Sequence, residues 1–195
     1  MSVQLRPGRM TVREFMDFEY DRERFRYELQ EGNLVTKSSP VPRHNVACAR
    51  LFGQLEAQFP AGFMVVTDID VDLQLAPADG PGTVRQPDVV VFRTEEYDRV
   101  HEEHDMIRAS SLVLAVEVHS PGSVRTDRVI KFMEYRDAGI AQYWMIDLDP
   151  PVTLRPYHLA GPFKYLPVGP EAVETYQTVE PFPLTIDLDA LVRTR

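Results

Sequence analysis

Two acidic residues stand in the most hydrophobic parts of the sequence. Asp88 opens the run 88–92, which continues as Val-Val-Val-Phe, and Glu117 interrupts the apolar run 112–118. Both runs are short, rich in β-branched residues and bounded by turn or polar residues, which predicts buried strands. An unpaired carboxylate in such a place is costly, so each acid must be neutralised, paired or bound to a metal.

A lysine on the following element completes a set of residues that can cleave phosphodiesters. Lys131 lies about two turns, or roughly 12 Å, into a helix predicted over 123–138. Helical side chains lean toward the helix N-terminus, so it can reach back toward Glu117. Mg²⁺ and Mn²⁺ prefer oxygen ligands, and such an ion polarises a phosphate and activates the attacking water. We therefore predict a site in which Asp88 and Glu117 hold Mg²⁺ or Mn²⁺ and Lys131 stabilises charge. The two carboxylates converge only if neighbouring strands run in opposite senses or are offset.

These residues need a scaffold, and the hydrophobic pattern predicts one of strands and helices. Strands are expected where apolar residues alternate or form short runs, and helices where they recur at helical spacing or follow an N-cap motif. The predicted strands are 25–30, 33–37, 63–66, 69–75, 88–92, 112–118, 140–148, 153–158, 163–167 and 184–186. The predicted helices are 11–18, 42–59, 123–138 and a short one at the C-terminus. We expect a single domain over 1–195, of class α/β or α+β, in which helices flank a mixed sheet.

The composition is that of a soluble globular protein. Of the 195 residues, 44% are hydrophobic and 26% are charged. No apolar run approaches the roughly 20 residues that span a bilayer, and no signal peptide is recognised. The single cysteine, Cys48, excludes an intramolecular disulfide and is expected to be a small core residue of a cytoplasmic protein. The net charge of −9 argues against general DNA affinity, although a local basic patch or a bound metal could still bind nucleic acid.

Several short motifs follow one another in an ordered series from about Thr11 to Tyr165. They are Tyr27-Glu28-Leu29, Gly32, Ser39-Pro40, His44, Pro87-Asp88-Val89, Val116-Glu117-Val118, Ser120-Pro121, Asp127, Lys131, Tyr135, Gly139, Tyr143-Trp144 and Asp147-Leu148-Asp149-Pro150. This series resembles the Uma-type restriction endonuclease family of the PD-(D/E)XK nuclease superfamily. No phosphate-binding loop, dinucleotide fingerprint or nucleophile elbow competes with that resemblance.

The resemblance implies a restriction-endonuclease-like core, a DNA substrate and often a homodimer. By position, Asp88 matches the motif aspartate and Glu117 the second acid, while Glu28 is an acid contributed from the N-terminal part, toward a second metal. The lysine of the usual E-x-K motif is absent because position 119 is histidine. In this family the lysine is displaced onto the following helix, where it corresponds to Lys131.

Each candidate also has a purely structural interpretation. Glu117 could be a buried partner of Lys131 or of an arginine, and Asp88 could cap a turn at a strand edge. Lys131 could form a surface pair with Asp127, four residues earlier. Glu28 could simply be exposed on a hairpin.

The histidines carry weaker expectations. His44 either points into the site or caps the helix that starts near it, with the cap slightly favoured. His101 and His104 lie among acids, but a solvated loop or helix face is the simpler interpretation. His119 occupies the motif's usual lysine position.

Two hypotheses from different classes remain. The first is a nuclease dependent on Mg²⁺ or Mn²⁺, favoured by the set Glu28, Asp88, Glu117 and Lys131. The second is a non-catalytic dimeric binding or scaffold module with the same fold, favoured by the acidic charge and by His119.

Overall fold

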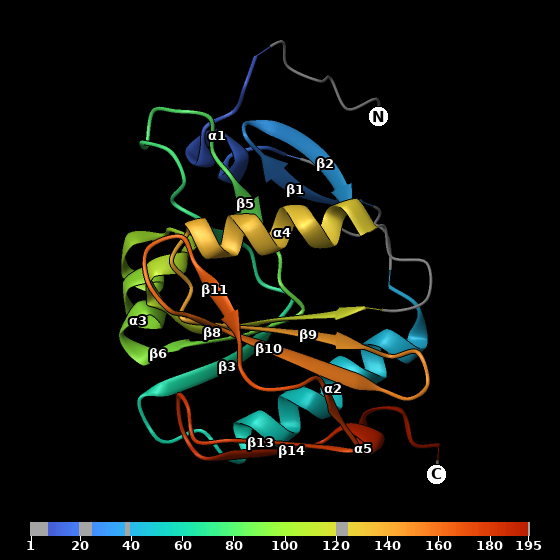
Figure 1. The fold of residues 1–195 in the computed structure, drawn as a ribbon. Helices are drawn as coiled ribbons and strands as arrows, with labels where there is room; N and C mark the ends of the chain where they lie inside the picture. The colour runs from blue at the N-terminus through green and yellow to red at the C-terminus, as the bar shows by residue number, and fades with distance from the viewer. Residues whose placement is uncertain (1–7, 20–24, 38–39, 120–124, 195) are drawn as a thin grey trace.

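The computed structural model describes residues 8–19, 25–37, 40–119 and 125–194, with only the backbone described for 125–128. Its main element is a seven-stranded mixed sheet (Figure 1). Neighbouring strands follow the order β11-β10-β9-β8-β6-β3, and β12 pairs with β10. Their bounds are β3 Phe63–Thr67, β6 Val89–Arg93, β8 Leu112–His119, β9 Gln142–Asp147, β10 Thr153–Leu159, β11 Tyr165–Pro167 and β12 Ala172–Val173. Of these, β8 and β9 are parallel, whereas β3, β6 and β8 are successively antiparallel.

A second, smaller sheet has five strands in the order β2-β1-β5-β4-β7. Its strands are β1 Arg26–Gln30, β2 Asn33–Lys37, β4 Val71–Asp72, β5 Val84–Arg85 and β7 Ile107–Arg108. Only β1 and β2 pair over five residues, because they form the hairpin predicted around Gly32, whose φ of +79° suits glycine. Pairing elsewhere in this sheet covers one or two residues per strand pair.

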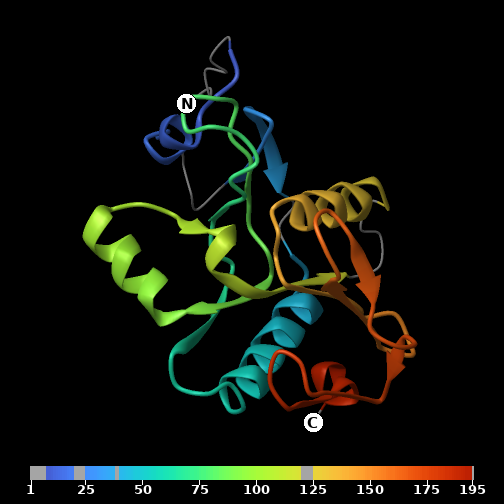
Figure 2. The ribbon, with the colours of Figure 1, turned by 60° about the vertical axis from the view of Figure 1, so that its left-hand side comes forward.

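Helices cover both faces of the seven-stranded sheet (Figures 1 and 2). Helix α2, Pro42–Glu56, packs on one face together with the hairpin β13 (Thr175–Thr178) and β14 (Leu184–Asp187) and with α5 (Leu188–Val192). Helix α4, Arg125–Asp137, crosses the other face and lies between this sheet and strands β1 and β5 (Figure 1). Both faces are therefore buried, which explains why β6 and β8 are continuous apolar runs rather than alternating ones.

Each face has its own hydrophobic core. Leu51 and Leu55 of α2 pack with Val89, Val116 and other residues whose side chains point toward that helix. On the α4 side, buried residues from both sheets gather around an aromatic cluster. The members of that core include Val71, Leu73, Val90, Phe92, Ala115, Tyr135, Tyr143 and Tyr165.

Most predicted elements are confirmed, and α1 (Val12–Met16) carries the expected capping box between Thr11 and Glu14. The strand predicted over 69–75 is wrong in extent, because only Val71–Asp72 pairs. Asp68 and Gln74 both have positive φ, which ends the extended conformation on either side. The charged stretch after β6, for which no element was assigned, forms helix α3, Thr94–Glu103.

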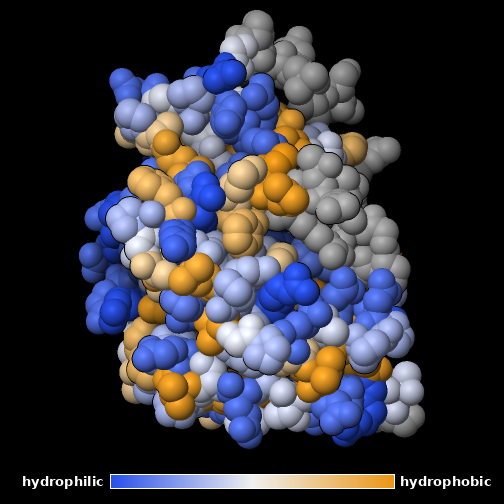
Figure 3. Space-filling view, viewed as in Figure 1, coloured by the Kyte–Doolittle hydropathy of each residue, from blue (hydrophilic) through white to orange (hydrophobic). Residues whose placement is uncertain are grey.

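Figure 3 shows the surface on the side of α4, where hydrophobic residues form small groups separated by hydrophilic ones. Within the described residues, no helix is both long and apolar enough to cross a membrane.

Candidate functional site

The antiparallel pairing of β6 and β8 places the two predicted acids at the same end of the sheet. Val89 pairs with Val116, so one further step along the ladder brings Asp88 opposite Glu117. The backbone N–H of Val118 donates a 2.7 Å hydrogen bond to Oδ2 of Asp88, which ties the two strand ends together. Both acids are buried, with 4% exposure each. The condition that the strands run in opposite senses is therefore met.

Two further groups, His44 and Lys37, help the Val118 N–H to hold Asp88 in its ionised form. His44 Nε2 lies 3.1 Å from Oδ2, and Lys37 Nζ lies 3.6 Å from Oδ1. Burial alone would raise the pKa of Asp88, but the hydrogen bonds from His44 and Val118 and the charge of Lys37 hold it below its usual range. In turn, the hydrogen bond to Asp88 raises the pKa of His44.

Glu117 is held in a different way, by two residues of α4. Lys131 Nζ lies 3.2 Å from Oε1 of Glu117, and the Tyr135 hydroxyl donates a 2.6 Å hydrogen bond to the same oxygen. Burial raises the pKa of Glu117 to about 7, and the negative charge of Asp88 adds to this while Lys131 opposes it. The paired acids thus have pKa values that are shifted in opposite directions.

The third acid, Glu28, arrives from β1 of the smaller sheet. Its Oε1 lies 3.2 Å from Lys131 Nζ and accepts a 3.1 Å hydrogen bond from the backbone N–H of Gln86. Burial would raise the pKa of Glu28, but Lys131 and Arg85 lower it below the ordinary value. Lys131 therefore bridges Glu28 and Glu117, so acids from both sheets meet at one ammonium group.

Arg85 and Glu134 support this arrangement, and the sequence interpretation missed both. Arg85 Nη1 donates to Oε2 of Glu28 at 2.8 Å, and its other nitrogens bind Glu134. A signal was present, because Glu134 and Tyr135 follow Lys131 by three and four residues and so share its helix face. Arg85 stands three residues before Asp88, on a two-residue strand that has no recognisable pattern.

A family model named Uma2 and described as "Putative restriction endonuclease" matches residues 12–190. The chain belongs to the Uma2 family. Among solved structures it is similar to one described as a putative nuclease belonging to DUF820 from Anabaena variabilis, with a TM-score of 0.68 and 16% identity. The match covers 94% of this chain and 97% of that chain. At this identity the likeness establishes the fold, which is restriction-endonuclease-like as expected. No curated protein matches the sequence.

The donor set of this Uma2 protein fits a divalent cation. Asp88 and Glu117 offer oxygen ligands on adjacent strands, and Asp88 raises the pKa of Glu117 because the two carboxylates repel. Among the described side chains, Lys131 and Tyr135 both bind Oε1 of Glu117 and leave Oε2 for another ligand. A bound cation would remove the repulsion that now disfavours ionised Glu117.

Several structural interpretations are excluded. Glu28 and Lys131 are each only 4% exposed, so neither belongs to a hairpin surface or an exposed ion pair. The side chain of Asp127, the other partner considered for Lys131, lies outside the described residues. His44 does not cap α2, whose N-cap is Val41 without a side-chain bond. Instead, His44 points at Asp88.

His101 and His104 are not part of this cluster of buried acids. His101 and His104 are exposed at the end of α3, as the simpler interpretation predicted. His119 is buried at the end of β8. It lies two residues after Glu117 and therefore on the same face of the strand.

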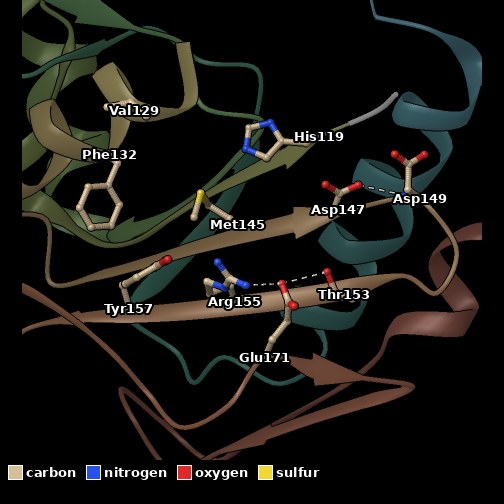
Figure 4. A pocket seen from close by; sticks show the side chains of 10 residues that line it. All are labelled: His119, Val129, Phe132, Met145, Asp147, Asp149, Thr153, Arg155, Tyr157 and Glu171. Atoms are coloured by element: carbon tan, nitrogen blue, oxygen red, sulfur yellow. Dashed lines mark hydrogen bonds and ion pairs between the residues drawn. The ribbon is translucent and has the colours of Figure 1, made fainter. Parts of the chain in front are cut away.

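A groove of about 640 Å³ begins at His119 and runs across β9 and β10 (Figure 4). Met145 and Asp147, which pair with Glu117 and His119 in the parallel ladder, form its floor. Among the described residues, three acids line the groove, namely Asp147, Asp149 and Glu171. The arginine among its described lining residues, Arg155, is paired with Glu171 at 3.1 Å. This acidic lining does not suit the phosphate backbone of a nucleic acid.

Proposed function

We propose that this Uma2 protein is an endonuclease that hydrolyses phosphodiester bonds of DNA with Mg²⁺ or Mn²⁺. The observation that carries the proposal is the facing pair Asp88 and Glu117, with Lys131 Nζ 3.2 Å from the second of them. A buried acid pair beside a lysine is costly as a purely structural device, because each charge must be desolvated. The solved structure described as a putative nuclease gives further support at the level of the fold.

In this proposal each residue has a distinct task. Asp88 and Glu117 would hold the ion, which supplies Lewis acidity and a more acidic bound water. Tyr135 fixes the orientation of Glu117 through its 2.6 Å hydrogen bond. Lys131 places a positive charge beside the acids, where it stabilises negative charge on the phosphate. Glu28 binds that ammonium on its other side and so positions it.

The domain organisation, the oligomeric state and the cellular location are further expectations for this protein. We expect a single domain over 1–195, because acids from both sheets meet at Lys131. A homodimer and a cytoplasmic location are further expectations, the first from the family resemblance and the second from the lone cysteine.

A second candidate function is a non-catalytic binding or scaffold module. It is favoured by the closed ion network, since Lys131, Arg85 and Lys37 already balance the buried acids without any metal. The net charge of −9 also favours it, because general DNA binding requires phosphate neutralisation by basic residues.

A plasmid cleavage assay separates these candidates. Supercoiled DNA should be nicked or linearised with Mg²⁺ or Mn²⁺, and Asp88→Ala should abolish both cleavage and calorimetric Mn²⁺ binding. Asp17→Ala is a matched control, because that acid is 65% exposed on the surface and pairs with Arg13 at the end of α1. An inactive wild type with every divalent metal, and Mn²⁺ binding unchanged in Asp88→Ala, would favour the scaffold.

A further inference from the structure

We propose that His44, Cys48 and Asp88 form a second metal site, selective for a thiophilic divalent ion of the Zn²⁺ class, that shares Asp88 with the proposed Mg²⁺ or Mn²⁺ site. The potential ligand atoms of the three side chains all lie within 4.8 Å of one another. Two elements supply them, because His44 and Cys48 are one helical turn apart on α2 and Asp88 precedes β6.

Two of the three separations between the ligand atoms are close to those around a tetrahedral ion. His44 Nε2 lies 3.1 Å from Asp88 Oδ2 and 3.9 Å from Cys48 Sγ. Zinc bonds of about 2.0–2.1 Å to nitrogen, 2.0–2.2 Å to oxygen and 2.3 Å to sulfur imply tetrahedral edges of roughly 3.4 Å and 3.6 Å for these pairs. These two distances are each within about 0.3 Å of the tetrahedral values. Cys48 Sγ also lies 3.6 Å from Nδ1, so the His44 ring must turn before Nε2 can bind an ion together with the thiolate.

The ligand types set the preference among metals. A thiolate, an imidazole and one carboxylate favour Zn²⁺ over Mg²⁺, whereas the Asp88 and Glu117 pair offers only oxygen. Three protein ligands leave a fourth position for water, as in catalytic rather than structural zinc sites. Cys48 is therefore more than the small core residue that the sequence predicted, although it is 8% exposed and packs in the core of the α2 face.

Binding requires that the Cys48 thiol lose its proton and that the hydrogen on His44 Nε2 either leave or move to Nδ1. Burial raises the pKa of the Cys48 thiol, so the metal-free residue stays protonated, and a coordinated ion displaces that proton to solvent. The ion also takes the place of the proton that joins His44 Nε2 to Asp88 Oδ2. Lys37 does not block this approach, because its Nζ lies 3.6 Å from the other oxygen, Oδ1.

Sharing Asp88 has a consequence that rests on the proposed function. If Asp88 holds Mg²⁺ or Mn²⁺ for cleavage, a zinc-class ion on Oδ2 draws the same carboxylate toward α2 and competes with the first ion. Zinc then acts as an inhibitor of the nuclease. The binding itself does not depend on any nuclease activity.

Cobalt spectroscopy tests the site directly. Co²⁺ added to the metal-free protein should give the intense near-ultraviolet absorption of a thiolate ligand and the visible bands of a tetrahedral ion. Cys48→Ser and Cys48→Ala should both remove the thiolate absorption. Since the loss of an outer partner typically weakens metal binding by about 10–100-fold, the loss of this ligand should weaken Zn²⁺ binding by at least about tenfold. A wild type without thiolate absorption, or one whose absorption survives in Cys48→Ala, overturns the proposal.

Measurements of Mn²⁺ binding separate a failure of the proposed zinc site from a failure of the proposed nuclease site. Cys48→Ala should bind Mn²⁺ as the wild type does, and Zn²⁺ should displace Mn²⁺ from the wild type at concentrations that leave Cys48→Ala loaded. Thiolate absorption without Mn²⁺ binding would support the zinc site and contradict the nuclease site. Mn²⁺ binding without thiolate absorption would support the nuclease site and contradict the zinc site. Simultaneous binding of both ions would overturn the shared use of Asp88.

Discussion

Arg85 and Glu134 form a bidentate ion pair next to Glu28, in which Arg85 Nε lies 2.6 Å from Glu134 Oε2 and Nη2 lies 2.8 Å from Oε1. The third nitrogen of the same guanidinium binds Glu28 at 2.8 Å. One arginine on the smaller sheet thus fixes both an acid of the site and the helix that carries Lys131. The planar fork of arginine suits this double role, which a lysine could not fill.

Removing Arg85 should destabilise the protein strongly. Arg85→Met leaves Glu28 and Glu134 without their shared partner, and breaking a buried pair in this way costs about 3–5 kcal/mol. Urea unfolding should show the loss in the free energy of unfolding. Arg13→Ala is the control, because its exposed pair with Asp17 should contribute only about 0.2–1 kcal/mol. Equal effects of the two substitutions would contradict a structural role for the guanidinium.

Replacing Lys131 should affect both stability and cleavage. If Lys131 formed only an exposed ion pair, Lys131→Ala would keep the wild-type melting temperature. Lys131 is instead buried between Glu28 and Glu117, so we expect the melting temperature of Lys131→Ala to decrease clearly. The double variant Lys131→Met/Glu28→Gln removes the lysine charge together with the charge of one of its two partners. It should therefore be more stable than a variant that lacks Lys131 alone. Cleavage should remain absent in this double variant. If cleavage returned together with stability, Lys131 would be only a structural residue.

Glu117 should give the metal-free protein a distinctive pH dependence. Between the ordinary pKa of 4.5 and about 7 the folded protein keeps a proton that the unfolded chain has lost. Stability from this group therefore falls as pH rises through that window, by up to about 1.4 kcal/mol per pH unit. Glu117→Gln cannot titrate, so its stability relative to the wild type should improve from pH 5 to pH 7.

The neighbouring acids do not disturb that comparison. The pKa values of Glu28 and Asp88 are lowered, so their contribution is lost only as pH falls below their ordinary values of 4.5 and 3.8. Parallel pH profiles of the wild type and Glu117→Gln, measured by urea unfolding with a chelator present, would show that Glu117 is ionised and paired with Lys131.

Mn²⁺ binding should release a proton below about pH 7, because the ion requires ionised Glu117. Affinity should rise between pH 5 and pH 7 and then level off. Calorimetry in two buffers with different ionisation heats measures the released protons. Glu117→Gln should bind weakly and show a smaller release, and an unchanged proton count in that variant would assign the proton to another group, such as His44.

The elements that carry the site were predictable because their patterns are strong. Glu117 interrupts the apolar run of β8, Asp88 immediately precedes that of β6, and the helical spacing around Lys131 is clear. Strands β5 and β7 were missed because two paired residues leave no periodicity. The antiparallel register that brings the acids together depends on tertiary packing, so the sequence could only state it as a condition.

The chemistry around Asp88 was less predictable. Lys37 is far from Asp88 in sequence, and an ordinary surface role explains such a residue equally well in a single sequence. Cys48 had a good explanation as a core residue, and only the folded position of α2 shows that its thiol lies beside His44 and Asp88.

Only Gln86, Pro87 and Asp88 separate strand β5 of the smaller sheet from strand β6 of the larger one. Strands β1, β2 and β5 of the smaller sheet have little pairing beyond the hairpin and pack in a small core, whereas β4 and β7 pack in the core that both sheets share. We therefore expect β1, β2 and β5 to open at a lower free energy than the large core requires. Such opening would carry Glu28 and Arg85 away from α4 while the larger sheet stays folded. The acids are therefore assembled around Lys131 only while these strands are packed against α4. On heating, this arrangement should be lost before the larger sheet unfolds.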